Sequence, residues 1–180
     1  PSRMIAAAFA MKIYEAKGRP SDNPLIVHIA EVSDLRNLTD EVPGKAVKLA
    51  KAFWPGPLTM IVKKSAAVPY ETTGGMDTVA VRMPNHPIAL ALIAASGTYI
   101  AAPSANTSGR PSPTAAEHVM TDLNEKIPLI LDGGSVGIGI ESTIIDLTEE
   151  TPMILRPGYI TQEMLEEVIG EVHVDPGLIA

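Results

Sequence analysis

Uncharged polar side chains are concentrated between Pro103 and Pro113, a segment that holds three serines, one threonine, one asparagine and three prolines. Ser104 and Asn106 alternate across one alanine, so both project to the same side of an extended chain. Hydroxyl and amide groups orient a polar ligand without adding charge, and Ser112 could close the segment from its other end. A Pro- and Ser-rich surface connection is the alternative, since prolines also stiffen loops that have no function.

Cations occur at two places where a helix or a strand is expected to end. Lys17 and Arg19 flank a glycine after the first helical pattern, and Arg156 precedes a Pro-Gly turn after a strand. Arginine presents a planar fork that matches the oxygens of phosphate, so both places could receive a phosphorylated ligand. The structural alternative for Lys17 and Arg19 is that their charge complements the dipole at the C-terminal end of a helix.

Three polar side chains lie within patterns that otherwise predict apolar strands. Thr78 and Arg82 are four residues apart and therefore share one face of a strand. An arginine in such a strand needs an anionic partner, and a structural carboxylate and a substrate carboxylate explain it equally well. His28 lies in the apolar strand 24–29, where a hydrogen-bonded core histidine is a more common explanation than a ligand-binding one.

The glycine-rich segment 133–142 allows the backbone to approach a ligand closely, and it opens onto Ser142 at the start of a strand. It is not a Walker A loop, because no Gly-Lys-Ser/Thr follows. The sequence also lacks a Gly-x-Ser-x-Gly motif, zinc-binding spacing among its histidines and an evident pair of catalytic carboxylates. The cations, hydroxyls and amide that remain suit phosphoryl or nucleotidyl transfer, which depends mostly on positioning and charge stabilisation.

Apolar periodicity and turn residues predict the elements that would position these groups. Helices are expected from Ile5 to Ala16, with Gly18 as the C-cap, and at 33–38, 43–53, 85–96, 114–122 and 161–169. Strands are expected at 24–29, 58–63, 78–83, 99–102, 129–131, 142–147 and 152–155. Their interleaved but not strictly alternating order predicts a single α/β domain with an open, twisted mixed sheet and helices on its faces.

Two helices carry more detailed expectations. Thr114 is expected as the N-cap of helix 114–122, with Glu117 completing a capping box. Helix 85–96 is expected to be capped by Asn85. The residues of that helix expected to face inward are Ile88, Ala91, Leu92 and Ala95.

The composition limits the class of protein. The 180 residues are 46% hydrophobic and only 4% aromatic, which is enough for one domain with an aliphatic core. Cysteine is absent, which excludes disulfides and thiolate metal sites and fits a reducing cytoplasm. A formal net charge of −7 argues against an overall basic surface for nucleic acid, but it leaves open a local basic face in the first half of the chain, where the charges are close to balanced. No apolar run reaches the ~20 residues of a membrane span, so we expect no membrane partner.

Six blocks, in this order along the chain, resemble the YrdC-type domain of the threonylcarbamoyl-adenylate synthase family: Lys17–His28, Trp54–Thr59, Val79–Pro84, Ala102–Gly109, Glu141–Asp146 and Leu155–Gly158. The resemblance covers residues 12–170 and implies a YrdC-like domain over residues 1–171, with a tail or linker over 172–180. The segment from Pro1 to Ala8 departs from the strand and Pro-Thr-Glu-Thr motif with which the family opens. We therefore expect an N-terminally incomplete domain whose sheet lacks one strand and whose site lacks one wall.

The resemblance implies an enzyme, a nucleotidyltransferase that forms threonylcarbamoyl-AMP and pyrophosphate from L-threonine, bicarbonate and ATP with Mg²⁺. A partner transferase complex then uses the product for threonylcarbamoyladenosine (t6A) modification of tRNA in the cytoplasm. The implied catalytic residues are Lys17, Arg19, Ser104 and Asn106. The implied ATP contacts are Arg19, Asn23, Thr78, Ser104, Ser112 and Arg156, the implied threonine contacts are His28, Arg82, Ala102 and Ser142, and no protein side chain is assigned to a metal.

Two other functions remain open from the sequence. The first is a non-catalytic module of the same fold that binds tRNA or double-stranded RNA by phosphate contacts. The net charge of −7 argues against it, whereas the altered N-terminus favours it. The second is a carbamoyl-adenylate domain like that of hydrogenase-maturation carbamoyltransferases.

Overall fold

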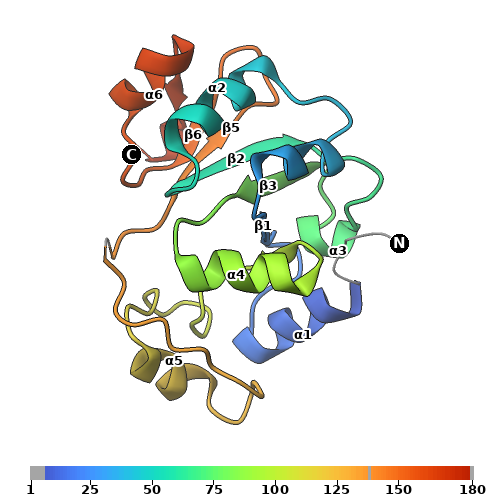
Figure 1. Cartoon of the computed structure of the whole chain (residues 1–180), viewed down its shortest axis with the longest axis vertical. Coiled ribbons are helices and arrows are strands. Elements are labelled where there is room, and N and C mark those ends of the chain that lie inside the picture. The colour runs from blue at the N-terminus through green and yellow to red at the C-terminus, as the bar shows by residue number, and fades with distance from the viewer. Residues whose placement is uncertain (1–6, 138, 179–180) are drawn as a thin grey trace.

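The computed structural model describes residues 7–137 and 139–178, and the described part folds around one seven-stranded mixed sheet (Figure 1). The strand order is β4-β1-β3-β2-β5-β6-β7. The strands are β1 Ile26–His28, β2 Leu58–Lys63, β3 Thr78–Arg82, β4 Ile100–Ala102, β5 Thr143–Asp146, β6 Met153–Arg156 and β7 His173–Val174. The α-helices are α1 Ala7–Lys17, α2 Gly44–Phe53, α3 Tyr70–Thr73, α4 Pro87–Ser96, α5 Ala116–Leu123 and α6 Gln162–Ile169, and two 3-10 helices are η1 Val32–Asn37 and η2 Pro176–Leu178. The predicted α/β class and mixed sheet are confirmed.

The sheet combines parallel and antiparallel neighbours. β1 pairs with β3, β2 with β5 and β6 with β7 in parallel, whereas β1 with β4, β2 with β3 and β5 with β6 are antiparallel. The register places His28 opposite Arg82, and Arg82 opposite Thr59 on its other side. Polar residues from three neighbouring strands therefore form one row across the middle of the sheet.

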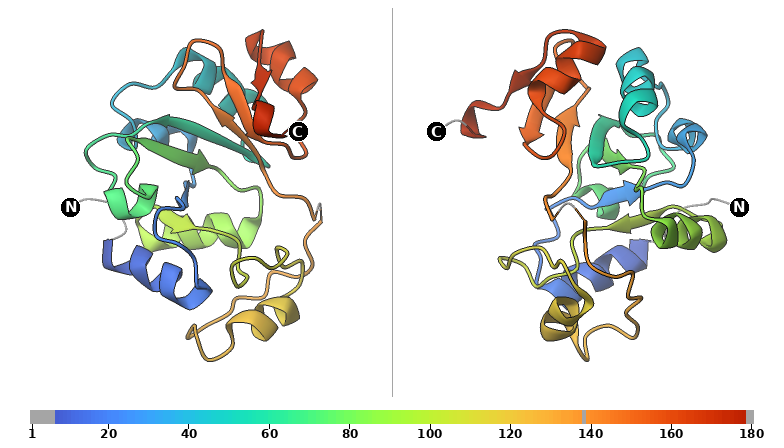
Figure 2. Two further views of the ribbon diagram at one scale, coloured as in Figure 1. Left: turned by 180° about the vertical axis from the view of Figure 1, so that it is seen from behind. Right: turned by 60° about the vertical axis from the view of Figure 1, so that its left-hand side comes forward.

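The two faces of the sheet differ in character because side chains alternate along each strand. On one face Val27, Met60, Val81 and Ile145 are buried within the main hydrophobic cluster. Residues of η1, α2 and α6, such as Leu35, Leu49 and Leu165, complete this cluster, and α2 packs against α6 (Figure 2). The opposite face carries Ile26, His28, Arg82 and Ile144, which are only partly buried, so this part of the second face is open to form a site.

Helix α4 presents a different side to the protein from the one that its sequence predicted. Ile93 is buried, whereas Ile88, Ala91, Leu92 and Ala95 are all exposed. The prediction of the inward face was therefore wrong. Because the segment PIALALIAAS is apolar on all sides, its periodicity does not distinguish one face from another. The N-cap is His86 rather than Asn85, with Pro87 at the first helical position.

The segment after the polar loop also departs from prediction. Helix α5 begins at Ala116 with Ala115 as its N-cap, so Thr114 does not cap it. The Nδ1 atom of His118 instead accepts a hydrogen bond from the Thr114 N–H at 3.3 Å. No strand forms at 129–131, where Leu129 and Leu131 are exposed. Both α5 and this segment lie at the end of the molecule away from the sheet (Figures 1 and 2).

The sheet continues past the expected domain boundary at residue 171. Val172 is buried, and His173–Val174 pairs with β6 as the edge strand β7, so the tail predicted for 172–180 begins inside the fold. Residues 1–6 and 179–180 lie outside the described part, and with them most of the segment that departs from the family's opening motif. None of the helices in the described part has the length and apolar character needed to span a bilayer.

Candidate active site

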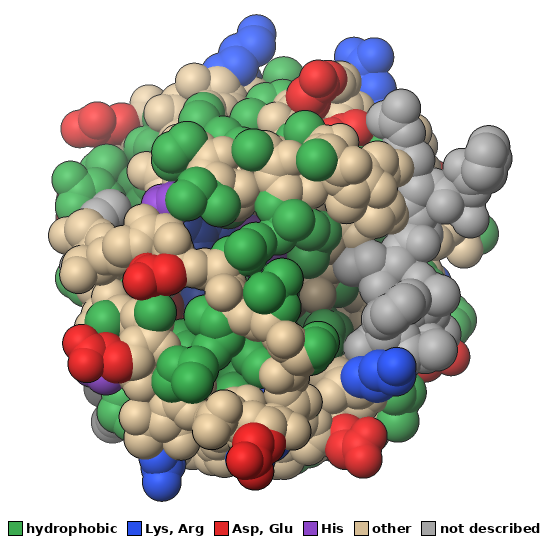
Figure 3. All heavy atoms as spheres, turned by 60° about the horizontal axis from the view of Figure 1, so that its bottom comes forward, with side chains coloured by type: hydrophobic (Ala, Val, Ile, Leu, Met, Phe, Trp, Pro, Cys, Tyr) green, Lys and Arg blue, Asp and Glu red, His purple; other side chains and the backbone are tan. Residues whose placement is uncertain are grey.

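A cavity of about 390 Å³ lies on the face of the sheet opposite the main core. Its floor is formed by alternate residues of the central strands. These are Ile26, His28, Ile61, Ala80, Arg82 and Ile144. Its walls come from Arg19 and Asn23, from the polar loop 102–114, and from Val136 with residues 139–142. Figure 3 shows this side of the molecule, where basic and histidine side chains are visible at the bottom of a hollow. Segments far apart in the sequence therefore converge on one concave surface.

Arg19 reaches the cavity because α1 ends just before it. Gly18 adopts a left-handed conformation, with φ of 61°, and turns the chain back toward β1. The Nη2 atom of Arg19 donates to Asn23 Oδ1 at 2.5 Å and to the Pro24 carbonyl at 3.0 Å. Burial lowers the pKa of Arg19 from its ordinary value. The guanidinium is thus fixed at the edge of the cavity by Asn23 and by the Pro24 carbonyl.

Lys17 does not line the cavity but supports the loop 104–106, which forms part of one wall. The side chain is only 4% exposed, and its Nζ donates to the carbonyl oxygens of Ser104, at 2.5 Å, and of Asn106. Asn106 is also buried, and its Nδ2 donates to the Arg110 carbonyl at 2.7 Å. Of this group Ser104 is the member that lines the cavity, so Lys17 and Asn106 support the loop that presents it.

His28 and Arg82 form the polar centre of the floor. Nδ1 of His28 lies 3.2 Å from the Ile100 carbonyl, which can only accept, so Nδ1 carries the proton and Nε2 keeps its lone pair. Burial, and secondly the positive charge of Arg82, lower the pKa of His28 to about 4. Arg82 donates from Nε to the Gly56 carbonyl at 3.2 Å, and no ion pair joins it to a carboxylate among the described residues. The structure therefore does not support a structural carboxylate as its partner.

Arg156 is bound along one edge to Ser142. Its Nε and Nη2 donate to the Ser142 carbonyl at 3.0 and 2.9 Å, and Nη2 also donates to Ser142 Oγ at 3.0 Å. The Ser142 hydroxyl lies 2.8 Å from Thr59 Oγ1. This network holds the Arg156 guanidinium over the cavity and, through Ser142, connects it to the centre of the sheet.

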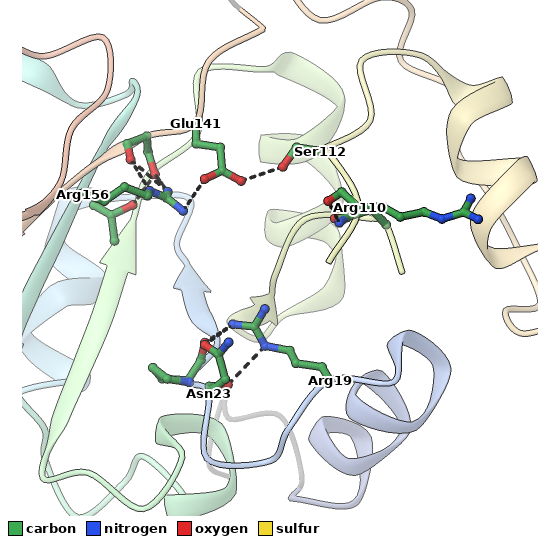
Figure 4. Close-up of polar contacts among 10 residues, drawn as sticks. Arg19, Asn23, Arg110, Ser112, Glu141 and Arg156 are labelled. Carbon is green, nitrogen blue, oxygen red and sulfur yellow. Dashed lines mark hydrogen bonds and ion pairs between the residues drawn. The ribbon is translucent and has the colours of Figure 1, made fainter. Parts of the chain in front are cut away.

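Glu141 is a member of the site that the sequence reasoning missed. Its Oε2 lies 2.8 Å from Arg156 Nη1, and its Oε1 accepts a hydrogen bond from Ser112 Oγ at 2.6 Å (Figure 4). Its place directly before Ser142 in a recognised block was the available signal. Figure 4 also shows Arg110 directed away from these residues. Its Nη1 atom pairs with Asp122 Oδ1 at 2.6 Å. Arg110 is therefore a cation of the same loop that does not belong to the cavity.

Thr78 lies at the far end of β3 from Arg82 and is not among the residues that line the cavity, whereas Ala102 is among them.

Three guanidinium groups and one carboxylate, Glu141, surround the hollow among the described residues. The excess of positive charge, together with the hydroxyl groups of Ser104, Ser112 and Ser142, favours an anionic ligand. Among residues 7–137 and 139–178, no cluster of three or more potential ligands is placed to hold a metal ion.

Comparison with known proteins gives consistent matches. The model of the Sua5/YciO/YrdC family, described as "Telomere recombination", matches residues 3–158. The chain is 60% identical over 168 residues to a threonylcarbamoyl-AMP synthase of Bacillus subtilis, covering 93% of this chain and 49% of that protein. It is 58% identical over 167 residues to the synthase of Pyrococcus abyssi, covering 93% and 49%.

The fold agrees with a solved structure of P. abyssi Sua5 complexed with L-threonine. The TM-score is 0.92 at 57% sequence identity, over 94% of this chain and 50% of the other. This chain therefore spans about half the length of these two curated relatives.

Proposed function

The chain belongs to the Sua5/YciO/YrdC family, and we propose that it forms L-threonylcarbamoyl-AMP and pyrophosphate from L-threonine, bicarbonate and ATP. The observation that carries this proposal is the convergence of Arg19, Arg82 and Arg156 with uncharged donors on one cavity. A cavity of this charge suits a nucleotide together with a small carboxylate-bearing substrate. The names of the relatives, and the threonine complex of one of them, support the same choice.

The threonine end of the site is proposed at the floor. Arg82, which has no carboxylate partner in the described structure, would receive the substrate carboxylate. His28 would present Nε2 as an acceptor to the amino or hydroxyl group of threonine. Ser142 and the backbone of Ala102, which also line the cavity, would orient the remaining polar groups.

The nucleotide end is proposed along the walls. Arg19 and Arg156 would neutralise the triphosphate, while Ser104, Ser112 and Asn23 would orient it. Thr78 is the implied ATP contact that this geometry supports least, because it does not line the cavity. Lys17 and Asn106 are proposed to act through the Ser104 loop as positioning residues.

The proposed reaction classes the protein as a nucleotidyltransferase. The threonine nitrogen bonds to the carbon of bicarbonate with loss of water, and a carbamate oxygen then attacks the α-phosphorus as pyrophosphate leaves. The arginines stabilise charge on the transferring group, and Mg²⁺ would enter as the counterion of ATP. The activated product suits transfer to tRNA by a partner complex, which implies a cytoplasmic enzyme, in keeping with the absence of cysteine.

The test is pyrophosphate release by the purified chain. We expect release from ATP when threonine and bicarbonate are both present, and background release when either is omitted. Release that is indifferent to threonine would contradict the proposal. In a second assay carbamoyl phosphate replaces threonine. Pyrophosphate release under that condition would instead indicate the activity of a carbamoyl-adenylate domain.

A further inference from the structure

Glu141 occupies two donors at the mouth of the cavity that a phosphate group would also use. Its two carboxylate oxygens contact Arg156 Nη1 at 2.8 Å and Ser112 Oγ at 2.6 Å, so one side chain bridges two separate segments of the chain (Figure 4). Carboxylates and phosphates accept hydrogen bonds from the same donors with similar geometry. The Glu141 carboxylate therefore occupies a position at which the same donors would bind a ligand oxyanion.

The hydrogen bonds of Arg156 show why this position matters. Nε and Nη2 are engaged with Ser142, so Nη1 is the part of the fork directed toward Glu141. Ser112 has a single hydroxyl proton, and that proton is donated to Glu141. A phosphate that uses the Ser112 hydroxyl, or the Nη1 hydrogen that points at Glu141, must displace the carboxylate.

The contact with Ser142 also makes Glu141 unnecessary for orienting Arg156. Three hydrogen bonds to the backbone and hydroxyl of Ser142 already fix the guanidinium. Glu141 itself is 46% exposed, so it can turn into solvent when it leaves Arg156 without burying an unpaired charge. Exchange of Glu141 for a ligand anion is therefore compatible with an unchanged fold.

We propose that Glu141 is a built-in competitor that binds Arg156 and Ser112 before the nucleotide arrives and is displaced by the polyphosphate of the nucleotide. This inference rests on the proposed function. A ligand with a single carboxylate gains little by replacing another carboxylate. A polyphosphate brings more charge and more acceptors, and it can also reach Arg19, whose charge interacts with that of Glu141 across the hollow. Glu141 thereby makes these two donors selective for polyphosphates.

The experiment measures the dissociation constants of ATP, pyrophosphate and adenosine by calorimetry for the wild type and Glu141→Gln. Glutamine removes the charge and keeps an oxygen that can accept from Ser112. Because the lost contact is a half-exposed ion pair, we expect Kd for ATP and pyrophosphate to fall by roughly threefold to tenfold. The Kd of adenosine, which carries no phosphate, should stay the same.

Glu149→Gln is the matched control, because it changes the net charge equally at an exposed turn between β5 and β6. We expect it to bind all three ligands like the wild type. Glu141→Ala should shift Kd in the same direction as Glu141→Gln, and the melting temperatures of all variants should agree within a few degrees.

Three results would overturn the inference. If Glu141→Gln bound ATP and pyrophosphate with the same affinities as the wild type, Glu141 would not be a competitor, and the proposed nucleotide site would be unaffected. Weaker ATP binding by Glu141→Gln would show that Glu141 holds the ligand instead. Failure of the wild type and the variant to bind either phosphate ligand would contradict the proposed function as well.

Discussion

His28 and Arg82 are register partners on the parallel strands β1 and β3, with both side chains on the cavity face of the sheet. The pair joins a neutral imidazole to a guanidinium that has no carboxylate partner in the described structure. The neutrality of His28 is itself a product of folding, because burial and the nearby Arg82 both disfavour the imidazolium. Two of the predictions below follow from this pair.

The pH dependence of stability should report the titration of His28. Its pKa falls from 6.5 to about 4 on folding, so below pH 6.5 the unfolded chain binds a proton that the folded chain does not. The free energy of unfolding should therefore decrease as the pH falls, by about 2 kcal/mol between pH 7 and pH 5 from this group alone. Urea denaturation at both pH values, compared with His28→Gln, isolates the effect, and an equal pH dependence in the two proteins would contradict it.

Arg82→Ala should impair the use of threonine more than the binding of ATP. Loss of a charged hydrogen-bonding partner predicts an increase in the KM for threonine of roughly tenfold to hundredfold. Steady-state pyrophosphate release at varied threonine gives KM, and calorimetry gives the Kd of ATP. Arg36→Ala, at an exposed position of η1, is the control. A parallel loss of ATP affinity would move Arg82 to the nucleotide end of the site.

Lys17→Ala should destabilise the protein, because it leaves two carbonyls of the Ser104 loop without their buried donor. We expect a loss of roughly 1–3 kcal/mol in the free energy of unfolding. Lys48→Ala, at an exposed site on α2, should have little effect. Urea denaturation measures both. Unchanged stability combined with lost ATP binding would show that Lys17 contacts the nucleotide directly.

Arg156→Ala and Arg110→Ala should separate a cation of the cavity from one outside it. Arg156 faces the cavity, whereas Arg110 pairs with Asp122 on the outside of the loop. Removal of Arg156 should raise the Kd of ATP by roughly tenfold to hundredfold, since it removes a charged donor. Arg110→Ala should bind ATP nearly as the wild type does. Calorimetry under identical salt decides, and equal losses would indicate a general effect of net charge.

Local signals in the sequence predicted those features that depend on neighbours along the chain. Gly18 ends α1 in the left-handed conformation, as its place after the helical pattern predicted. The two-residue period of strand β3 placed Val79 and Val81 in the core, and with them fixed the opposite orientation of Arg82. These outcomes follow from backbone geometry alone, so a single segment contains the necessary information.

The order of the six blocks also identified the family and, with it, the fold. The predicted residues Arg19, His28, Arg82, Ser104, Ser112 and Arg156 all line one cavity. Their roles toward ATP and threonine remain predictions.

Features set by contacts between distant segments were decided by the tertiary structure. The inward face of α4 could not be read from a helix that is apolar on all sides. Lys17, grouped with Arg19 by spacing, instead lies under the loop 104–106 because that loop supplies carbonyl acceptors 87 and 89 residues away. The sequence alone determined which groups could bind an anion. Packing determined which of these groups face the cavity, and it placed the carboxylate of Glu141 beside them. Burial and pairing depend on residues that meet only after folding.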